Sequence, residues 1–555
     1  MLPSPPAMTS SESTPPTVAS SRNSADDHHG SGHLARSAGT IGAATLTSRL
    51  LGLARDQTLA YLFGAGNAMD AFNVAYRIPN LMRDLFAEGV MSAAFVPTFT
   101  RRLTLQGKAA AWHVGNQVVN ALIIATGTLV VLGIIFADPL ARLLAGNYAQ
   151  VPGKLELTIF LTRIMLPFLT LVAIAAAVMG MLNSLNRFLV PALSPAMFNV
   201  GIIASAVLLV PVMPRWGLHP ITAIAIGAII GGFGQILLQL PSLYREGYRY
   251  RPELDPADSG LREILGLIGP GTIAGAALQV NLLVNMVLAT GEGTGAVSWL
   301  SYAFRVMYLP IGLFGVSIAT ATLPAISRQA AQEDLPEFRK TVSTAMRMML
   351  VLNIPALVGL MVLAEPIIGL IFQRGSFGPS DTTATTAALM FYAPGLVGYS
   401  TVRIAIPCFY AMRNSLTPTL VSVMSVALNI ALNVILVRVL GFRGLALGTS
   451  IAALFNALVL IALLQRRLHG IDLARILKTG GKITVAAAFM GAAVSISHSW
   501  LVDSLPEAGF LPRSFQVFGS VAIGVAVLAA SARLLRISEW LDLERQLVTG
   551  RTRTP

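Results

Sequence analysis

Residues 48–100 read SRLLGLARDQTLAYLFGAGNAMDAFNVAYRIPNLMRDLFAEGVMSAAFVPTFT, and this stretch sets charged side chains inside apolar runs. The whole chain has 555 residues, of which 54% are hydrophobic and 12% charged, whereas a soluble domain carries about 25% charged residues. Long apolar runs recur along it, and a bilayer core about 30 Å thick needs about 20 such residues per helix. The composition therefore predicts an all-α integral membrane protein.

Fourteen apolar segments can be placed between residues 38 and 536, which predicts 14 transmembrane helices. Cytoplasmic loops of membrane proteins hold an excess of Lys and Arg. One set of alternate loops holds 17 of these residues, and the other holds 7, namely Arg142, Lys154, Arg215, Arg374, Arg438, Arg443 and Arg513. We therefore expect a multi-pass protein with both termini in the cytoplasm.

An internal repeat is visible at an offset of 227 residues, which pairs FVPTFTRRL (95–103) with TLPAISRQA (322–330). It also aligns Pro97, Pro139 and Pro191 with Pro324, Pro366 and Pro418. Each unit holds six helices, an even number, so both copies enter the membrane in the same direction. We expect two pseudo-symmetric six-helix lobes, residues 37–245 and 262–467, around a central cavity, as in rocking transporters. An inert duplication is the alternative.

Three segments lie outside the repeat. Residues 478–537 hold the two C-terminal helices of the predicted fourteen. Residues 1–36 are rich in Ser, Pro and Thr and lack an apolar stretch, which predicts a disordered cytoplasmic tail. Residues 538–555 are expected to form a basic cytoplasmic tail.

Several classes of function are disfavoured by the composition. The net charge of +13 is spread over short connections, so it does not form the basic face of a nucleic-acid-binding protein. The single cysteine, Cys408, cannot build a disulfide framework or a thiolate metal site. The sequence has no Walker A loop and no His-Glu-x-x-His motif. We therefore expect no cofactor and no enzyme activity, with a membrane glycosyltransferase as the less favoured alternative.

The charges of residues 48–88 need a polar environment, because an Arg near the bilayer centre costs about 2.5 to 3.5 kcal/mol on insertion scales. Residues seven apart differ by only about 20° around a helix, so Arg49 and Asp56 share a face. One stripe of the next helix holds Asp70, Asn73, Arg77, Asp84 and Glu88. Bends at Gly52 and Pro79 would bring Arg55 and Arg83 to the same side. These side chains are expected to face a hydrated cavity.

The second half of the chain adds Arg305 and Arg403, each within an apolar segment. A guanidinium group stays charged and donates two parallel hydrogen bonds to phosphate oxygens. A ring of arginines from both lobes therefore suits a pyrophosphate. The alternative is that the charges pair with one another, Arg49 with Asp56 or Arg77 with Asp70, and lock the helices together.

Neutral polar side chains form a separate group in the second half. Asn429 and Asn433 are spaced i, i+4 on one segment, and Thr449 lies on the next. Their oxygens could hold Na⁺, whereas hydrogen bonding between helices is the alternative.

The quoted stretch closely resembles the MurJ (MviN) family of lipid II flippases. The elements that carry the resemblance are S-R-x-x-G-x-x-R-D (48–56), F-G-A-G (63–66), D-A-F (70–72) and F-A-E-G-x-x-S-x-A-F-V-P (86–97). Weaker similarity extends over about residues 37 to 536.

The resemblance implies the fourteen-helix fold of the multidrug/oligosaccharidyl-lipid/polysaccharide (MOP) exporter superfamily in the bacterial inner (plasma) membrane. It implies movement of lipid II, the undecaprenyl-pyrophosphate-linked peptidoglycan precursor, from the cytoplasmic to the periplasmic leaflet. It also implies that residues 478–537 form a groove for the lipid tail. Membrane lipids and cell-wall synthesis proteins are the expected partners. A flippase for another polyprenyl-linked saccharide is the alternative.

The resemblance implies that the residues required in the family match Arg49, Arg55, Asp70, Arg83 and Arg305. Ser48, Asp56 and Glu88 lie inside the same motifs, and Arg403 is added from its own sequence context. The expected substrate-binding residues are Arg49, Arg55, Asp70, Arg83, Arg305, Ser48, Asp56, Glu88 and Arg403. Some relatives are thought to bind Na⁺ in the second lobe with at least one carboxylate, where this chain has Asn429 and Asn433. Na⁺ and the membrane potential therefore both stay open as energy sources.

Overall fold

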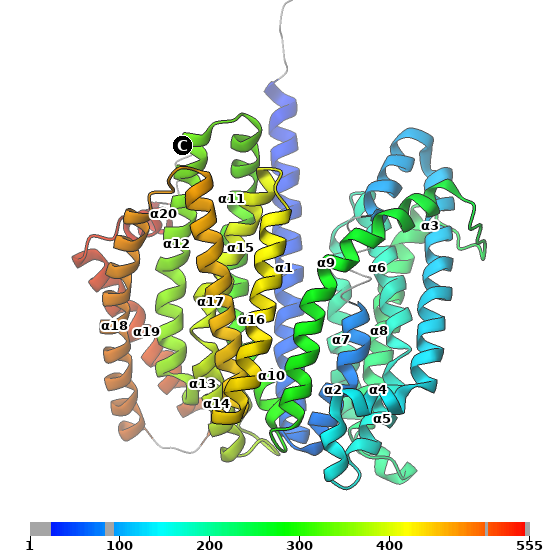
Figure 1. The fold of residues 1–555 in the computed structure, drawn as a ribbon, viewed down its shortest axis with the longest axis horizontal. Helices are drawn as coiled ribbons and strands as arrows, with labels where there is room; N and C mark the ends of the chain where they lie inside the picture. The colour runs from blue at the N-terminus through cyan, green and yellow to red at the C-terminus, as the bar shows by residue number, and fades with distance from the viewer. Residues whose placement is uncertain (1–23, 84–93, 506–508, 550–555) are drawn as a thin grey trace, which may run out of the picture.

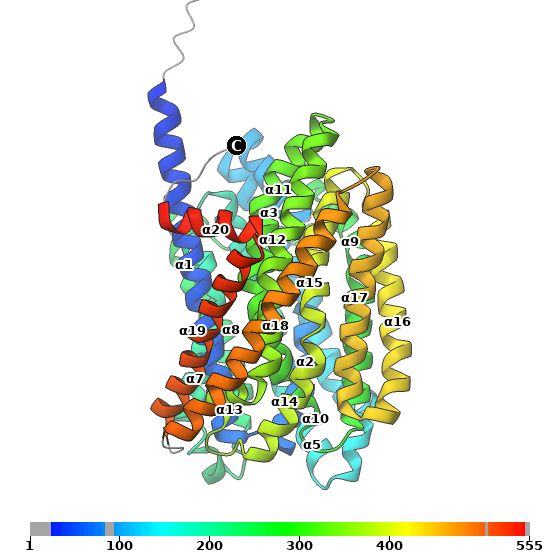
Figure 2. The same ribbon diagram turned by 90° about the vertical axis from the view of Figure 1, so that its left-hand side faces the viewer.

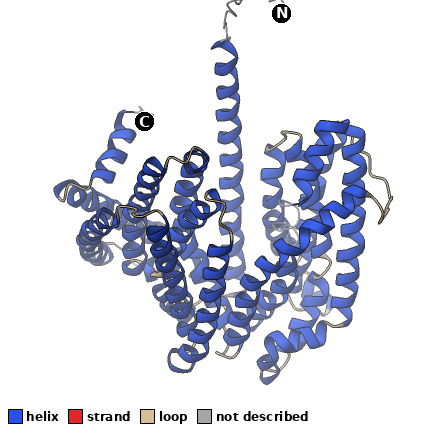
Figure 3. Ribbon diagram, turned by 45° about the horizontal axis from the view of Figure 1, so that its top comes forward, coloured by secondary structure: helices blue, strands red, loops and turns tan. Residues whose placement is uncertain are grey.

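A computed structural model describes residues 24–83, 94–505 and 509–549 of the chain. Every regular element among these residues is a helix (Figure 3). Ten of the described helices are long and apolar enough to cross a membrane, or eleven if the bent pair α14 (Pro379–Tyr392) and α15 (Gly395–Ala411) is one span. The prediction of an all-α, multi-pass membrane protein is confirmed, and the count of fourteen spans stays a prediction.

Helix α1 (Ser24–Phe63) is 40 residues long and stands between two groups of helices (Figure 1). It begins inside the segment 1–36 for which a disordered tail was expected. A helix that has already formed extends easily, because each added residue adds one hydrogen bond. Residues 24–36 belong to this helix, and the tail expected for residues 1–36 stays a prediction.

One group, on the right of Figure 1, consists of α2 to α8. Their bounds are Asn67–Arg83 (α2), Val96–Ile135 (α3), Ala137–Ala145 (α4), Lys154–Met165 (α5), Phe168–Ser184 (α6), Leu189–Leu208 (α7) and Thr222–Arg245 (α8). Helices α7 and α8 approach closely because glycines face each other. A Cβ on Gly201 would lie only 2.5 Å from the backbone nitrogen of Gly231. Small residues allow such close packing, which drives helix association in membranes.

The other group consists of α10 to α20, and α9 (Ser259–Thr290) crosses between the groups (Figure 1). Besides α14 and α15, its α-helices are Ala296–Pro310 (α10), Val316–Ala331 (α11), Leu335–Val362 (α12), Ala364–Phe372 (α13), Leu416–Leu440 (α16), Phe442–Arg467 (α17), Leu473–Ser504 (α18), Phe510–Leu534 (α19) and Ser538–Thr549 (α20). Figure 2 shows α18 and α19 side by side along the outside of α12. The expected basic tail begins as α20, whose carboxylates Glu539 and Glu544 pair with Arg347 and Arg533.

The two groups meet at the end where α1 finishes and diverge toward the end where it begins (Figures 1 and 3). At the closed end, Thr294 Oγ1 donates to Asn67 Oδ1 at 2.8 Å. The backbone N–H of Ser376 donates to the carbonyl of Tyr61 at 2.9 Å. The short connection between α1 and α2 is therefore held against the second group by specific hydrogen bonds.

Candidate functional site

A cavity of about 530 Å³ lies between α1, α2, α7 and α10. Six of the nine residues that the sequence nominated for substrate binding line it: Ser48, Arg49, Arg55, Asp56, Arg83 and Arg305. Four of these carry positive charge and one carries negative charge. The structure therefore brings cationic side chains from distant segments of the chain to one place.

Asp56 is the carboxylate at the centre of this arrangement and is only 5% exposed. Its Oδ1 accepts hydrogen bonds from Arg55 Nε at 3.0 Å and Arg55 Nη2 at 2.8 Å. The same oxygen pairs with Nη1 of Arg305, which links α1 to α10. The alternative of charges that pair with one another is thus partly correct, but the pairs differ from the expected Arg49–Asp56 pair.

Arg49 lies on the exposed side of α1 and forms no ion pair or hydrogen bond with the described residues. Its guanidinium group lies against the π-helical turn Ile311–Gly315 that follows α10. A Cβ on Gly312 would come within 2.5 Å of Arg49 Nη1. The missing side chain at Gly312 therefore makes room for this arginine.

The remaining nominated residues occupy different positions. Arg403 on α15 is exposed and hydrogen-bonds through Nη2 to the hydroxyl of Tyr308, which itself lines the cavity. Arg403 is not among the lining residues. Glu88 lies outside the described residues. Arg403 is therefore connected to the cavity through one neighbour.

Asp70 does not line the cavity, and its side chain is fully buried at the closed end. Its Oδ2 accepts from Lys154 Nζ at 2.9 Å and from the backbone N–H of Gly295 at 2.7 Å. Its Oδ1 accepts from Ser298 Oγ at 2.7 Å. The expected pairing of Asp70 with an arginine is wrong, because Lys154 on α5 supplies the cation. Through Gly295 and Ser298, this carboxylate joins the first helix group to α10.

A second cavity of about 320 Å³ shares Tyr76, Asn80, Phe304 and Arg305 with the first. The shared walls make the two cavities one chamber between the groups. Sequence analysis did not identify Tyr76, Asn80 or Phe304 as site residues. A usable signal existed, because Tyr76, Asn80 and Arg83 recur at i, i+4 and i+7, which places them on one face of α2.

The asparagine cluster lies in the second group, and Asn429 and Asn433 are buried. Asn433 Nδ2 donates to Asn429 Oδ1 at 3.0 Å and also to Asn285 Oδ1. One NH₂ group therefore occupies the position between two oxygens that a cation would need. Among the residues described, no group of three or more His, Cys, Asp or Glu side chains could hold a metal ion.

The fold and the chamber define a class of protein. A polar chamber between two groups of membrane-spanning helices is the arrangement found in rocking transporters. An inward-facing multidrug resistance MATE family transporter of the MOP superfamily has the same fold, with a TM-score of 0.65 over 78% of this chain and 98% of the other, at 15% identity. The structure titled lipid II flippase MurJ, inward closed conformation, matches with a TM-score of 0.74 and 26% identity over 89% of this chain and 99% of its own.

Sequence comparison then specifies the family. The model of the family described as lipid II flippase MurJ matches residues 59–511. A probable lipid II flippase MurJ of Vibrio cholerae is 34% identical over 90% of this chain and 95% of its own length. One from Bdellovibrio bacteriovorus is 35% identical over 82% of this chain and 86% of its own. The chain belongs to the MurJ family.

Proposed function

We propose that this chain moves lipid II from the cytoplasmic to the periplasmic leaflet of a bacterial inner membrane. Family membership supports this proposal, since the relatives are named for that activity. The single observation that carries it is the cavity in which Arg49, Arg55, Arg83 and Arg305 surround one described carboxylate, Asp56. One guanidinium group can donate two parallel hydrogen bonds to two phosphate oxygens. This cavity therefore suits the diphosphate that links the sugar to the lipid.

The mechanism begins with the diphosphate entering from the open end of the chamber. There it competes with Asp56 for the guanidinium groups of Arg55 and Arg305. Residues 37–245 and 262–467 act as the two rocking lobes, and the contacts of Asp70 with Gly295 and Ser298 form the closed gate. Neutralising the excess positive charge removes repulsion across the chamber, which favours closure around the headgroup.

The orientation follows from the charge distribution. The open end carries the loops rich in Lys and Arg, which the positive-inside rule assigns to the cytoplasm. Both termini then lie in the cytoplasm, and the Asp70 gate closes the periplasmic side. Helices α18 and α19 cover α12 on the lipid side (Figure 2), where they offer a surface for the polyprenyl tail.

The membrane potential is the energy source that fits this chain. The asparagine cluster does not fit Na⁺ as arranged, because Asn433 donates into the position between the oxygens of Asn429 and Asn285. A charge that crosses the membrane field gains about 2.3 kcal/mol per 100 mV. Lipid II flipping measured in Na⁺-free medium, with the potential imposed or collapsed by an ionophore, tests this assignment. Flipping that needs Na⁺ at constant potential contradicts it.

The central test is complementation of a strain depleted of its lipid II flippase. Arg49→Glu should abolish growth, because it inverts a cavity charge that no described carboxylate neutralises. Arg305→Glu should do the same, although it also breaks the pair with Asp56. Arg443→Glu is the control, since Arg443 is exposed on α17 and away from the cavity. Protein levels are measured by immunoblot for all variants.

The substrate is identified by following lipid II itself during depletion. Lipid II should accumulate in the inner leaflet, and an enzyme added outside spheroplasts should no longer cleave it. Normal growth of Arg49→Glu at normal protein level contradicts the assigned role of the cavity. Unchanged exposure of lipid II during depletion points instead to another polyprenyl-linked saccharide.

A further inference from the structure

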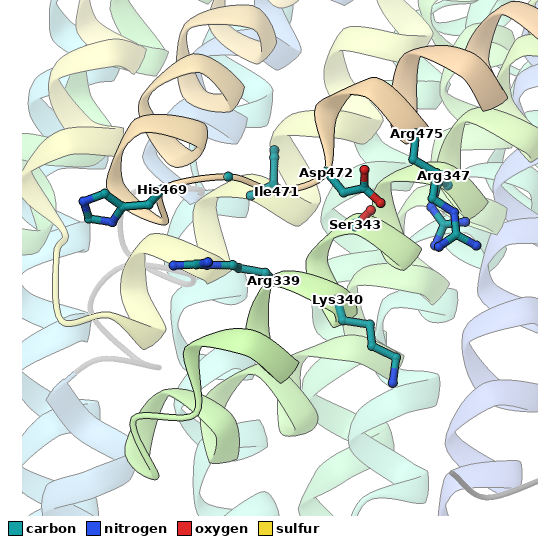
Figure 4. Close-up of a pocket in the computed structure, with 9 residues that line it drawn as sticks. Arg339, Lys340, Ser343, Arg347, His469, Ile471, Asp472 and Arg475 are labelled. Carbon is teal, nitrogen blue, oxygen red and sulfur yellow. The ribbon is translucent and has the colours of Figure 1, made fainter.

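A second basic pocket of about 350 Å³ lies outside the transport chamber, at the open end of the second helix group (Figure 4). One wall is the first turns of α12, where Arg339, Ser343 and Arg347 follow one another at intervals of four residues. Such residues lie on the same face of a helix. The other wall is the connection between α17 and α18 together with Arg475 in the first turn of α18. The pocket shares no lining residue with the chamber.

Two of its cations are already compensated. Arg347 is 6% exposed and forms an ion pair with Glu539 of α20. Lys340 pairs with Glu337 at 3.1 Å on the surface of α12. Arg339 and Arg475 form no ion pair with the described residues, and Asp472 is the one acidic residue that lines the pocket. The pocket therefore keeps an excess of positive charge.

Buried polar atoms of the pocket also lack partners. Ser343 is 3% exposed, and its hydroxyl makes no hydrogen bond with the described residues. The Nε atoms of Arg347 and Arg339 are buried and likewise unpartnered there. A buried donor without an acceptor costs about 1 to 3 kcal/mol. The walls of the pocket therefore contain three polar donors that no described group satisfies.

The second wall of the pocket also favours an anion. Helix α18 begins after Asp472, whose side chain does not cap it. The free N–H groups and the positive end of the dipole at a helix start favour an anion. Figure 4 shows Arg347 and Arg475 close together beside this helix start. Two guanidinium groups placed close together repel each other, and an anion between them removes that repulsion.

The sequence around the pocket indicates a position at the depth of the lipid headgroups. The apolar part of α12 begins after Arg347, and Lys478 and Lys482 follow Arg475 in the first turns of α18. Helix α20 lies across the ends of α12 and α19 rather than along them (Figure 2). A short helix in that orientation is typical of the membrane interface. Basic pockets between transmembrane helices at this level bind phosphate-bearing headgroups.

We propose that this pocket is a binding site for a phosphate group, held by Arg475 and Ser343 beside the start of α18 and supplied by an anionic phospholipid or by a soluble phosphate. Topology signalling by positive charge is the simpler explanation of the basic residues. It does not explain buried donors without acceptors, since a topology signal needs only exposed charge. The site is independent of the lipid that the central chamber carries.

The test measures the apparent melting temperature of the purified full chain in detergent. Short-chain phosphatidylglycerol, inorganic phosphate, and a diacylglycerol with the same chains are added separately at constant ionic strength. Phosphatidylglycerol or phosphate should raise the melting temperature of the unsubstituted chain, and diacylglycerol should not. The variant Arg339→Gln/Arg475→Gln should lose more than about half of that shift. The control Arg466→Gln/Arg467→Gln removes the same charge from the same end, outside the pocket, and should keep it.

The outcomes separate the two sources. A shift with phosphatidylglycerol alone identifies the lipid headgroup, and a shift with inorganic phosphate, with or without the lipid, shows that phosphate itself is sufficient. The absence of any shift in the unsubstituted chain, or an equal shift in the pocket variant, overturns the proposal. If the double variant does not purify, Arg475→Gln provides the same comparison, because the exposed side chain of Arg475 makes no described hydrogen bond or ion pair.

Discussion

The buried pair of Asp70 and Lys154 allows a quantitative test of how the closed end is stabilised. Asp70 is 0% exposed and Lys154 is 3% exposed. The substitution Lys154→Met keeps the length of the side chain and removes its charge. Breaking a buried pair by removing one partner costs about 3 to 5 kcal/mol, because it leaves an uncompensated charge.

The size of the loss follows from the other contacts of the carboxylate. Asp70 still accepts from the backbone N–H groups of Gly295 and Ser298 and from the Ser298 hydroxyl. These donors compensate part of the charge, so we expect the lower end of the range, about 3 kcal/mol. The double variant Asp70→Asn/Lys154→Met carries no charge at this position and should recover at least half of the loss.

Thermal unfolding of the detergent-solubilised protein measures the relative stability of these variants. The expected ranking of apparent melting temperature is the unsubstituted chain first, then the double variant, then Lys154→Met. Arg142→Met is the matched control, since it breaks an exposed pair with Asp138 and should leave unfolding unchanged. A Lys154→Met protein as stable as the unsubstituted chain, or a double variant less stable than the single, refutes the reasoning.

Two further predictions concern the chamber and the surface. Gly312→Ala should reduce lipid II flipping while stability stays within error, because the new Cβ displaces the flexible end of Arg49. In the control Gly127→Ala on α3, the new Cβ meets no atom within 4 Å, so neither flipping nor stability should change. Full flipping by Gly312→Ala contradicts the assigned position of Arg49. Hydrogen bonds from Lys108 and Arg187 hold the pKa of Glu246 below its usual value of 4.5, so its contribution to stability is present above that value and is lost as the pH falls through the lower, folded-state pKa. In Glu246→Gln, the free energy of unfolding should therefore depend less on pH below about pH 5. Urea unfolding measured at several acidic pH values tests this, and an unchanged pH dependence disproves the role of Glu246.

Much of the candidate site was predictable because its residues lie in short motifs. Arg49 and Asp56 lie seven residues apart on one helix, so helical periodicity places them on one face, whereas Arg55 was assigned to the same side only through an expected bend at Gly52. The cost of charge in a bilayer then requires a cavity for them. Arg305 could be nominated for the same reason, although its pairing with Asp56 joins residues 249 positions apart.

Other features were beyond the reach of such reasoning. The partner of Asp70 lies on α5, and no local pattern distinguishes Lys154 from any other basic residue near a helix start. Tyr76 and Phe304 form shared walls of the chamber only because α2 and α10 face each other. The hydrogen bond from the Asn433 amide to Asn285 depends on the packing of α9 against α16.

The sequence by itself determined the membrane environment and the helix faces that carry charge, because hydropathy and helical periodicity are local properties of the chain, and its motifs in residues 48–100 carried the resemblance to the family. Only the tertiary structure decided which charges neutralise one another and which stay available for a ligand. Arg55 and Arg305 share Asp56, while Arg49 and Arg475 pair with no described carboxylate. Ion pairing depends on distances of a few ångströms between helices that are remote in sequence, and those distances are set by packing.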